Sequence, residues 1–133
     1  MSAQNIILQW MSACSQTIRD YDHAGHMNLI SKDVQVFGVP GFEVIGYQDW
    51  YAQSEHEFNQ RLILDAKYEG IKLRQENESQ IMFVTMESIT ASDKSVNNQG
   101  LEVILTKEAD GYWRVTQERL LSTEEAKHFG IAV

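Results

Sequence analysis

The side chains best suited to chemistry are polar residues among apolar neighbours in strand-like segments of the second half: Glu87, Glu102, Gln117 and Arg119. Burial would perturb the pKa of Glu87 or Glu102, and these two are the candidate bases for any catalysis. A buried Arg119 would hold a ligand carboxylate through paired hydrogen bonds. Gln117 and Arg119 share the alternation phase of Val115, and we assign both to a ligand site. The alternative places these residues on an outer sheet face, in cross-strand pairs or a dimer interface.

Histidine and cysteine offer little for a metal site. His23 and His26 lie three residues apart, close to Asp20 and Asp22, but no third ligand follows at a suitable distance. An exposed helix face capped by Asp22 is therefore the favoured interpretation of the two histidines. Cys14 is the only cysteine, and with no histidine expected near it a buried, unreactive thiol is favoured over a nucleophile. We predict no metal and no cofactor.

Composition excludes several classes of function. The formal net charge of −8 argues against a nucleic acid as partner. No apolar run approaches the roughly 20 residues of a membrane span, so no membrane association is expected. With one cysteine there is no internal disulfide, and a cytoplasmic location is expected. One proline and no Ser/Gly-rich linker in 133 residues indicate a single domain, 1–133.

Apolar periodicity predicts three helices in the N-terminal half. Residues 3 to 20 carry apolar side chains at steps of three and four, which is the pattern of an amphipathic helix. Asp22 can cap a short second helix. A third helix begins after Gly46 and places one set of side chains on a single face: Tyr47, Trp50, Tyr51, Ser54 and Phe58.

The remaining segments predict strands. A small hairpin is expected from residues 33–37 and 42–45, joined by a turn at Pro40-Gly41. Four long strands follow, with a bulge near Gly70 where the alternation changes phase. The tail begins with Ser122 and Glu125, which can form the capping box of a short helix. The fold class is therefore α+β, with three N-terminal helices packed on a strongly bent, mixed or antiparallel sheet of four long strands plus the hairpin.

This order of elements resembles the nuclear transport factor 2-like (NTF2-like) superfamily, the cystatin-like α+β cone that includes SnoaL-type cyclases and ketosteroid isomerase. The residues that carry the resemblance are the Asp33-Val34 strand start, the VIGYQDW joint and the DGYWRV start of the last strand. The resemblance implies a cone whose mouth is closed by the hairpin and the third helix. It also implies that a set of side chains from the first and third helices lines the cavity: Trp10, Cys14, Trp50, Tyr51 and Ser54.

The catalytic residues of ketosteroid isomerase do not carry over to this sequence. The positions of its aspartate base and its tyrosine donor correspond to Gly38 and Cys14, and its protonated aspartate corresponds to a position near Val103. The histidines that many relatives have late in the last strand are replaced by Gln117 and Arg119. The resemblance therefore implies the fold and a pocket, and leaves the reaction open.

Two functions remain. The first is a homodimer that binds a small, largely apolar ligand in the cone, with acid–base activity of the lyase, isomerase or cyclase type if the protein is an enzyme. The second is a non-catalytic interaction or regulatory module whose cavity is plugged by its own aromatic side chains. Both faces of the second long strand, residues 80–90, are half apolar, which predicts dimerisation through the sheet face.

Overall fold

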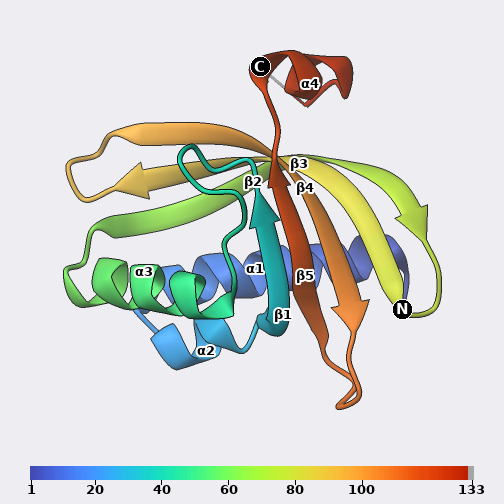
Figure 1. Ribbon diagram of the computed structural model, residues 1–133, viewed down its shortest axis with the longest axis horizontal. Coiled ribbons are helices and arrows are strands. Elements are labelled where there is room, and N and C mark those ends of the chain that lie inside the picture. The colour runs from blue at the N-terminus through green and yellow to red at the C-terminus, as the bar shows by residue number, and fades with distance from the viewer. Residues whose placement is uncertain (132–133) are drawn as a thin grey trace.

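The computed structural model describes residues 1–131 and contains four helices and five strands in that range. The helices are α1 (Ala3–Arg19), α2 (His23–Met27), α3 (Tyr47–Asn59) and α4 (Thr123–His128). The strands are β1 (Ile30–Phe37), β2 (Ile63–Glu76), β3 (Gln80–Ala91), β4 (Val96–Lys107) and β5 (Trp113–Leu120). They form one sheet in the order β1-β5-β4-β3-β2, in which β1 runs parallel to β5 and the other neighbours are antiparallel (Figure 1).

The predicted α+β architecture is confirmed, with a difference at the small hairpin. The segment 42–45 forms only a single bridge, between Ile45 and Val36, and does not become a strand. Gly38 and Gly41 both adopt positive φ angles, of 90° and 87°, so the chain leaves the strand direction directly after β1. The strand β1 satisfies its backbone by parallel pairing with β5 instead.

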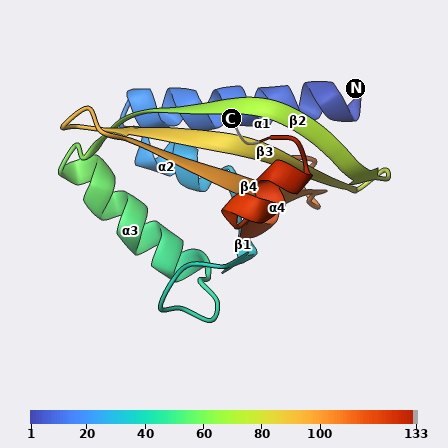
Figure 2. The same ribbon diagram turned by 90° about the horizontal axis from the view of Figure 1, so that it is seen from above.

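The helices α1 and α3 enclose the concave side of the sheet. The apolar face of α1 packs Ile7, Trp10 and Cys14 against the sheet, as its periodicity predicts. Seen from above, α3 diverges from α1, and α2 lies between them (Figure 2). Only Ser54 and Phe58 of α3 are buried, so much of the inner side of this helix lies next to open space.

Two of the register shifts in the sheet bear on the direction of its side chains near the cavity. Gly70 has a φ of 71° at a register shift between β2 and β3, which confirms the bulge predicted there. A second register shift lies between β4 and β5. Val115 pairs with Leu105 and Gln117 pairs with Ile104, so Thr116 is an extra residue in β5. Beyond Thr116, the inner face of β5 is formed by even-numbered residues, and the alternation phase of Val115 no longer applies.

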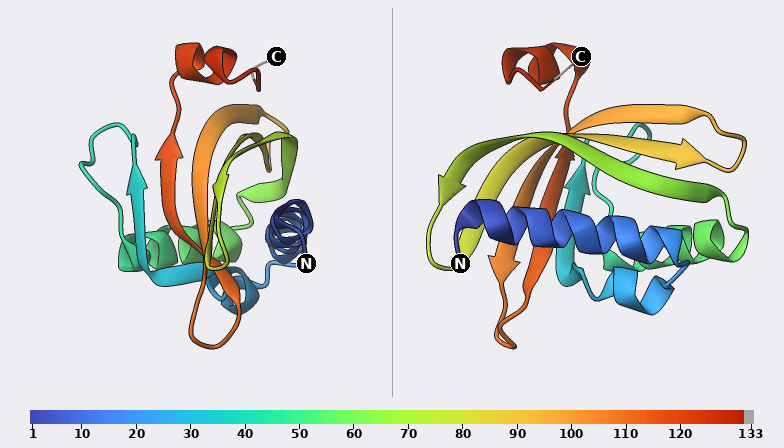
Figure 3. Two further views of the ribbon diagram at one scale, coloured as in Figure 1. Left: turned by 90° about the vertical axis from the view of Figure 1, so that its right-hand side faces the viewer. Right: turned by 180° about the vertical axis from the view of Figure 1, so that it is seen from behind.

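The fourth helix covers part of the convex face, on the side of the sheet away from α1 (Figure 3). Its predicted capping box is present, because Ser122 and Glu125 exchange hydrogen bonds of 3.1 Å. Ala126 packs with Val84 and Met86 of β3. It also lies close to Gly100, where an added Cβ atom would be only 3.1 Å from the Cβ atom of Ala126. A segment of the same chain thus covers apolar surface that we had assigned entirely to a partner subunit.

Candidate functional site

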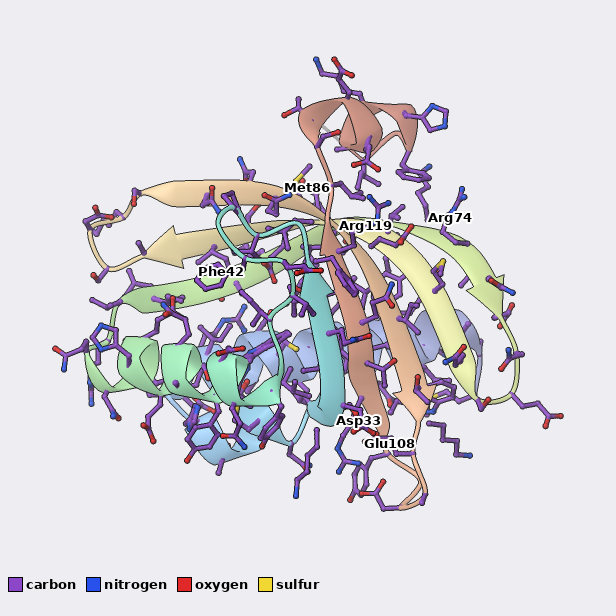
Figure 4. All side chains as sticks on the ribbon, in the orientation of Figure 1. Asp33, Phe42, Arg74, Met86, Glu108 and Arg119 are labelled. Carbon is purple, nitrogen blue, oxygen red and sulfur yellow. The ribbon has the colours of Figure 1, made fainter. Side chains whose placement is uncertain are left out.

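A cavity of about 750 Å³ lies between the concave sheet face and the helices α1, α2 and α3. Its wall is largely apolar and aromatic, with contributions from Trp10, Trp50, Phe58 and Tyr68. Phe42, on the loop between β1 and α3, also contributes to the wall (Figure 4). A cavity of this size and lining suits a small organic ligand that has a substantial apolar part.

Two carboxyl groups share the inner part of this cavity. Glu87 projects from β3 beside its β2 partner Tyr68, and Glu118 projects from β5 opposite Val103 of β4. Burial and the neighbouring Glu87 raise the pKa of Glu118 to about 8. Burial also raises the pKa of Glu87, but the hydrogen bond from Tyr68 stabilises its ionised form and opposes that change. Because the two groups titrate together, the pair loses its protons in two coupled steps, and burial raises the pKa of both carboxyl groups.

The groups around the pair stay neutral. Burial, with further contributions from Cys14 and the two glutamates, raises the pKa of Tyr68 well above its usual value, so its hydroxyl remains a donor. Burial, followed by the charges of Glu87 and Glu118, likewise raises the pKa of Cys14. Because a thiol in such surroundings resists ionisation, Cys14 is not an activated nucleophile.

His26 forms another part of the cavity wall. Its Nε2 atom accepts a hydrogen bond of 3.1 Å from Trp50 Nε1, which places its proton on Nδ1, a buried atom with no partner among the described residues. Burial, and to a lesser extent His23, lower the pKa of His26 to about 4, so the ring is neutral. The expectation that this histidine is exposed is wrong, because α2 lies between α1 and α3 and His26 is only 7% exposed.

No family model matches this sequence, and no curated protein matches it. Solved structures do. An NTF2-like protein of unknown function from Shewanella oneidensis has a TM-score of 0.74 at 13% identity, over 90% of this chain and 98% of that one. An NTF2-like protein from Cytophaga hutchinsonii has a TM-score of 0.72 at 14% identity, over 92% and 99%. A putative scytalone dehydratase from Novosphingobium aromaticivorans has a TM-score of 0.66 at 15% identity, over 90% and 83%.

This chain has the NTF2-like fold. The resemblance seen in the sequence is thereby confirmed at the level of architecture, and identities of this size carry no statement about activity. Within residues 1–131, no helix is long and apolar enough to cross a membrane. The same residues contain no cluster of three or more histidine, cysteine, aspartate or glutamate side chains that could hold a metal ion.

Most of the predicted cavity residues lie in the wall of this NTF2-like cone: Trp10, Cys14, Trp50, Ser54 and Glu87. The Ser54 hydroxyl donates to the Trp50 carbonyl oxygen at 2.7 Å and lies 2.9 Å from His23 Nε2, so its hydrogen-bonding capacity is largely used within the protein. Tyr51 is a correction, because it turns to the other side of α3, where it is 38% exposed and lines a separate hollow with His23 and Tyr47.

Arg119, Gln117 and Glu102 are also corrections, since none of them belongs to the described wall of the cone cavity. The Arg119 guanidinium pairs with Glu102 at 3.3 Å and with Glu125 of α4 at 2.7 Å, on the convex side of the sheet. It lies close to the end of β5 that leads to α4 (Figure 4). The physical reason is the extra residue Thr116, which reverses the direction of every later side chain in β5.

The same bulge explains why sequence analysis missed Glu118, the more perturbed carboxyl of the pair. Alternation from Val115 places Glu118 on the outside, and nothing in the residue pattern around Thr116 indicates an extra residue. Tyr68 could have been found, because it shares its strand face with the buried Ala66. The role of His26 depends on how α2 packs between two other helices, which no local pattern reports.

Proposed function

We propose that this protein binds a small, largely apolar molecule in the cone cavity and transfers a proton on it with Glu87 and Glu118. The observation that carries the proposal is the pair of carboxyl groups in one aromatic cavity, both with a pKa raised by burial, of which that of Glu87 is opposed by Tyr68. Two carboxyl groups with different protonation states can serve as base and acid in the same reaction.

We assign Glu87 as the ionised member and Glu118 as the protonated one, because Tyr68 opposes the rise in the pKa of Glu87. The Glu87 carboxylate removes a proton from a carbon next to a ligand carbonyl, and the Glu118 carboxylic acid donates its proton to the carbonyl oxygen as the enol forms. Return of a proton to carbon gives back the ketone or an isomer, and the loss of a neighbouring hydroxyl group would make the same step part of a dehydration. Tyr68 orients the Glu87 carboxylate through its hydroxyl group.

This proposal keeps Glu87 as the base and replaces Glu102 with Glu118. One of the structural neighbours is described as a putative scytalone dehydratase, and a dehydratase is a lyase, which fits the proposed chemistry. The alternative function, a binding module with a plugged cavity, is disfavoured by about 750 Å³ of open space beside the carboxyl pair.

We further propose that the protein is a homodimer through the convex sheet face. Met82 of β3 and Ile104 of β4 are direct cross-strand partners there and are only half-buried. The helix α4 packs on Val84 and Met86 further along β3, so the patch around Met82 and Ile104 is the apolar surface left for a second subunit.

The proton-transfer proposal is tested with beta-tetralone, an apolar bicyclic ketone, in deuterium oxide. The native protein is expected to accelerate exchange of the protons next to the carbonyl, followed by mass spectrometry of the ketone. Glu87→Gln and Glu118→Gln are expected to lower that rate by about 100-fold or more. Glu55→Gln, an exposed glutamate of α3, is the matched control and should leave it unchanged. Binding of the ketone without exchange above the buffer rate would overturn the catalytic proposal.

A further inference from the structure

The cone cavity contains carboxyl groups but no lysine or arginine among the described residues of its wall. Its acidic members come from three elements: Asp49 and Glu57 of α3, Glu87 of β3 and Glu118 of β5. The other titratable groups in the wall are Cys14, His26 and Tyr68. All three are neutral near neutral pH, because burial is the largest influence on each pKa.

An anionic ligand would therefore enter a cavity with no positive charge to receive it. A ligand carboxylate beside Glu87 would add a second negative charge to a desolvated site, and both effects are unfavourable. The guanidinium that could have received it, Arg119, is held on the convex face by Glu102 and Glu125. This geometry disfavours the carboxylate ligands that the sequence had suggested.

The aromatic wall favours the opposite charge. The indole rings of Trp10 and Trp50 and the ring of Phe58 lie in the same cavity as the two glutamates. Aromatic faces attract organic cations, most strongly where water is excluded, and a carboxylate at the end of such a cavity supplies the counter-charge. Neither feature by itself specifies a ligand, but together they match an apolar molecule that carries an amino group.

We propose that the cavity is selective for organic amines: a ring-containing, apolar skeleton lies against the tryptophan and phenylalanine side chains, and its ammonium group lies against Glu87 and Glu118. This inference rests on the proposed function in one respect, that the cavity holding the glutamate pair is the ligand site. It goes further because it names a class of ligand that the proton-transfer proposal does not, and a bound amine, which ionises Glu118, would occupy the cavity without undergoing the acid step proposed for Glu118.

Binding of an ammonium group has a consequence for the proton held by the pair. A positive charge beside Glu118 makes a second carboxylate favourable, so the carboxylic acid releases its proton to the buffer as the ion pair forms. The charges balance, because an ammonium ion and a carboxylic acid give an ammonium carboxylate pair and one free proton. The raised pKa of Glu118, about 8 before binding, makes this release measurable near neutral pH.

The test compares probes with one skeleton and different charges: beta-aminotetralin, beta-tetralone and the corresponding tetralin carboxylic acid. Isothermal titration calorimetry in buffers with different ionisation enthalpies gives both the affinity and the number of protons released. The amine is expected to bind at least about 10-fold more tightly than the ketone. It is also expected to release a fraction of one proton, and the carboxylic acid should bind more weakly than the ketone.

Variants separate the two carboxyl groups. Glu118→Gln should abolish proton release while the amine still binds, and Glu87→Gln should remove the preference for the amine over the ketone. Glu55→Gln should behave as the native protein does.

Equal binding of amine and ketone, or tighter binding of the carboxylic acid, would overturn the selectivity, and so would binding of none of the probes. If the ketone undergoes exchange but the amine is not preferred, only this inference fails. If the amine is preferred and the ketone shows no exchange, only the catalytic proposal fails.

Discussion

Glu118 of β5 and Glu87 of β3 line the same cavity, where burial, followed by the neighbouring Glu87, raises the pKa of Glu118 to about 8. The two residues belong to strands separated by β4, and burial raises the pKa of Glu87 while Tyr68 of β2 opposes that rise. Strands of one bent sheet thus place two carboxyl groups in one cavity, with no lysine or arginine in its described wall.

The first prediction concerns stability and Glu118. Its folded-state pKa of about 8 lies above the ordinary value of 4.5, so the folded protein retains a proton that the unfolded chain has lost. Stability is therefore expected to fall as the pH rises from about 4.5 to about 8, by an amount on the order of a few kcal/mol. Urea unfolding across this range should show the decline in the native protein and a flatter profile in Glu118→Gln. A native-like decline in that variant would contradict the assignment, and Glu55→Gln provides the matched control.

For His26 we expect the opposite dependence of stability on pH. Its pKa is lowered from 6.5 to about 4, so the unfolded chain binds a proton that the folded protein excludes. The contribution of His26 to stability is therefore lost as the pH falls through this interval. His26→Phe should weaken this acid sensitivity in urea unfolding, while His128→Gln, at an exposed site, should leave it as in the native protein. If the stability of His26→Phe falls with decreasing pH as it does in the native protein, another group causes the loss.

Arg119 is predicted to be dispensable for ligand binding. Its ion pairs with Glu102 and Glu125 lie on the convex face and are partly exposed, so Arg119→Met should cost about 1 kcal/mol of stability or less. The affinity for beta-tetralone, measured by calorimetry, should not change. A loss of affinity for beta-tetralone of about 10-fold or more would mean that Arg119 reaches the cavity in solution.

The proposed dimer predicts sensitivity at the convex patch. Met82→Lys and Ile104→Lys place a charge at adjacent half-buried positions of that face, and each should convert a dimer into a monomer in native mass spectrometry. Val96→Lys, at an exposed position of β4, is the control and should remain dimeric. A native protein that is already monomeric would contradict the interface, and α4 would then be the principal cover of the convex face.

The sequence by itself determined the elements and most of their faces. The periodicity of α1, the third helix after Gly46, the bulge at Gly70 and the capping box of α4 all depend on residues close together in the chain, and each appears as expected. Trp10, Cys14 and Trp50 were assigned to the cavity by the resemblance to the NTF2-like family, and all three line it.

Only the tertiary structure decided which polar side chains line the cavity. The parallel pairing of β1 with β5 and the extra residue at Thr116 are properties of strand register, and register has no signature in a single strand. That one residue turned Arg119 outward and Glu118 inward. The perturbed pKa values of Glu118 and His26 then follow from burial and from neighbours distant in the chain, because desolvation depends on everything that surrounds a group and not on its sequence position.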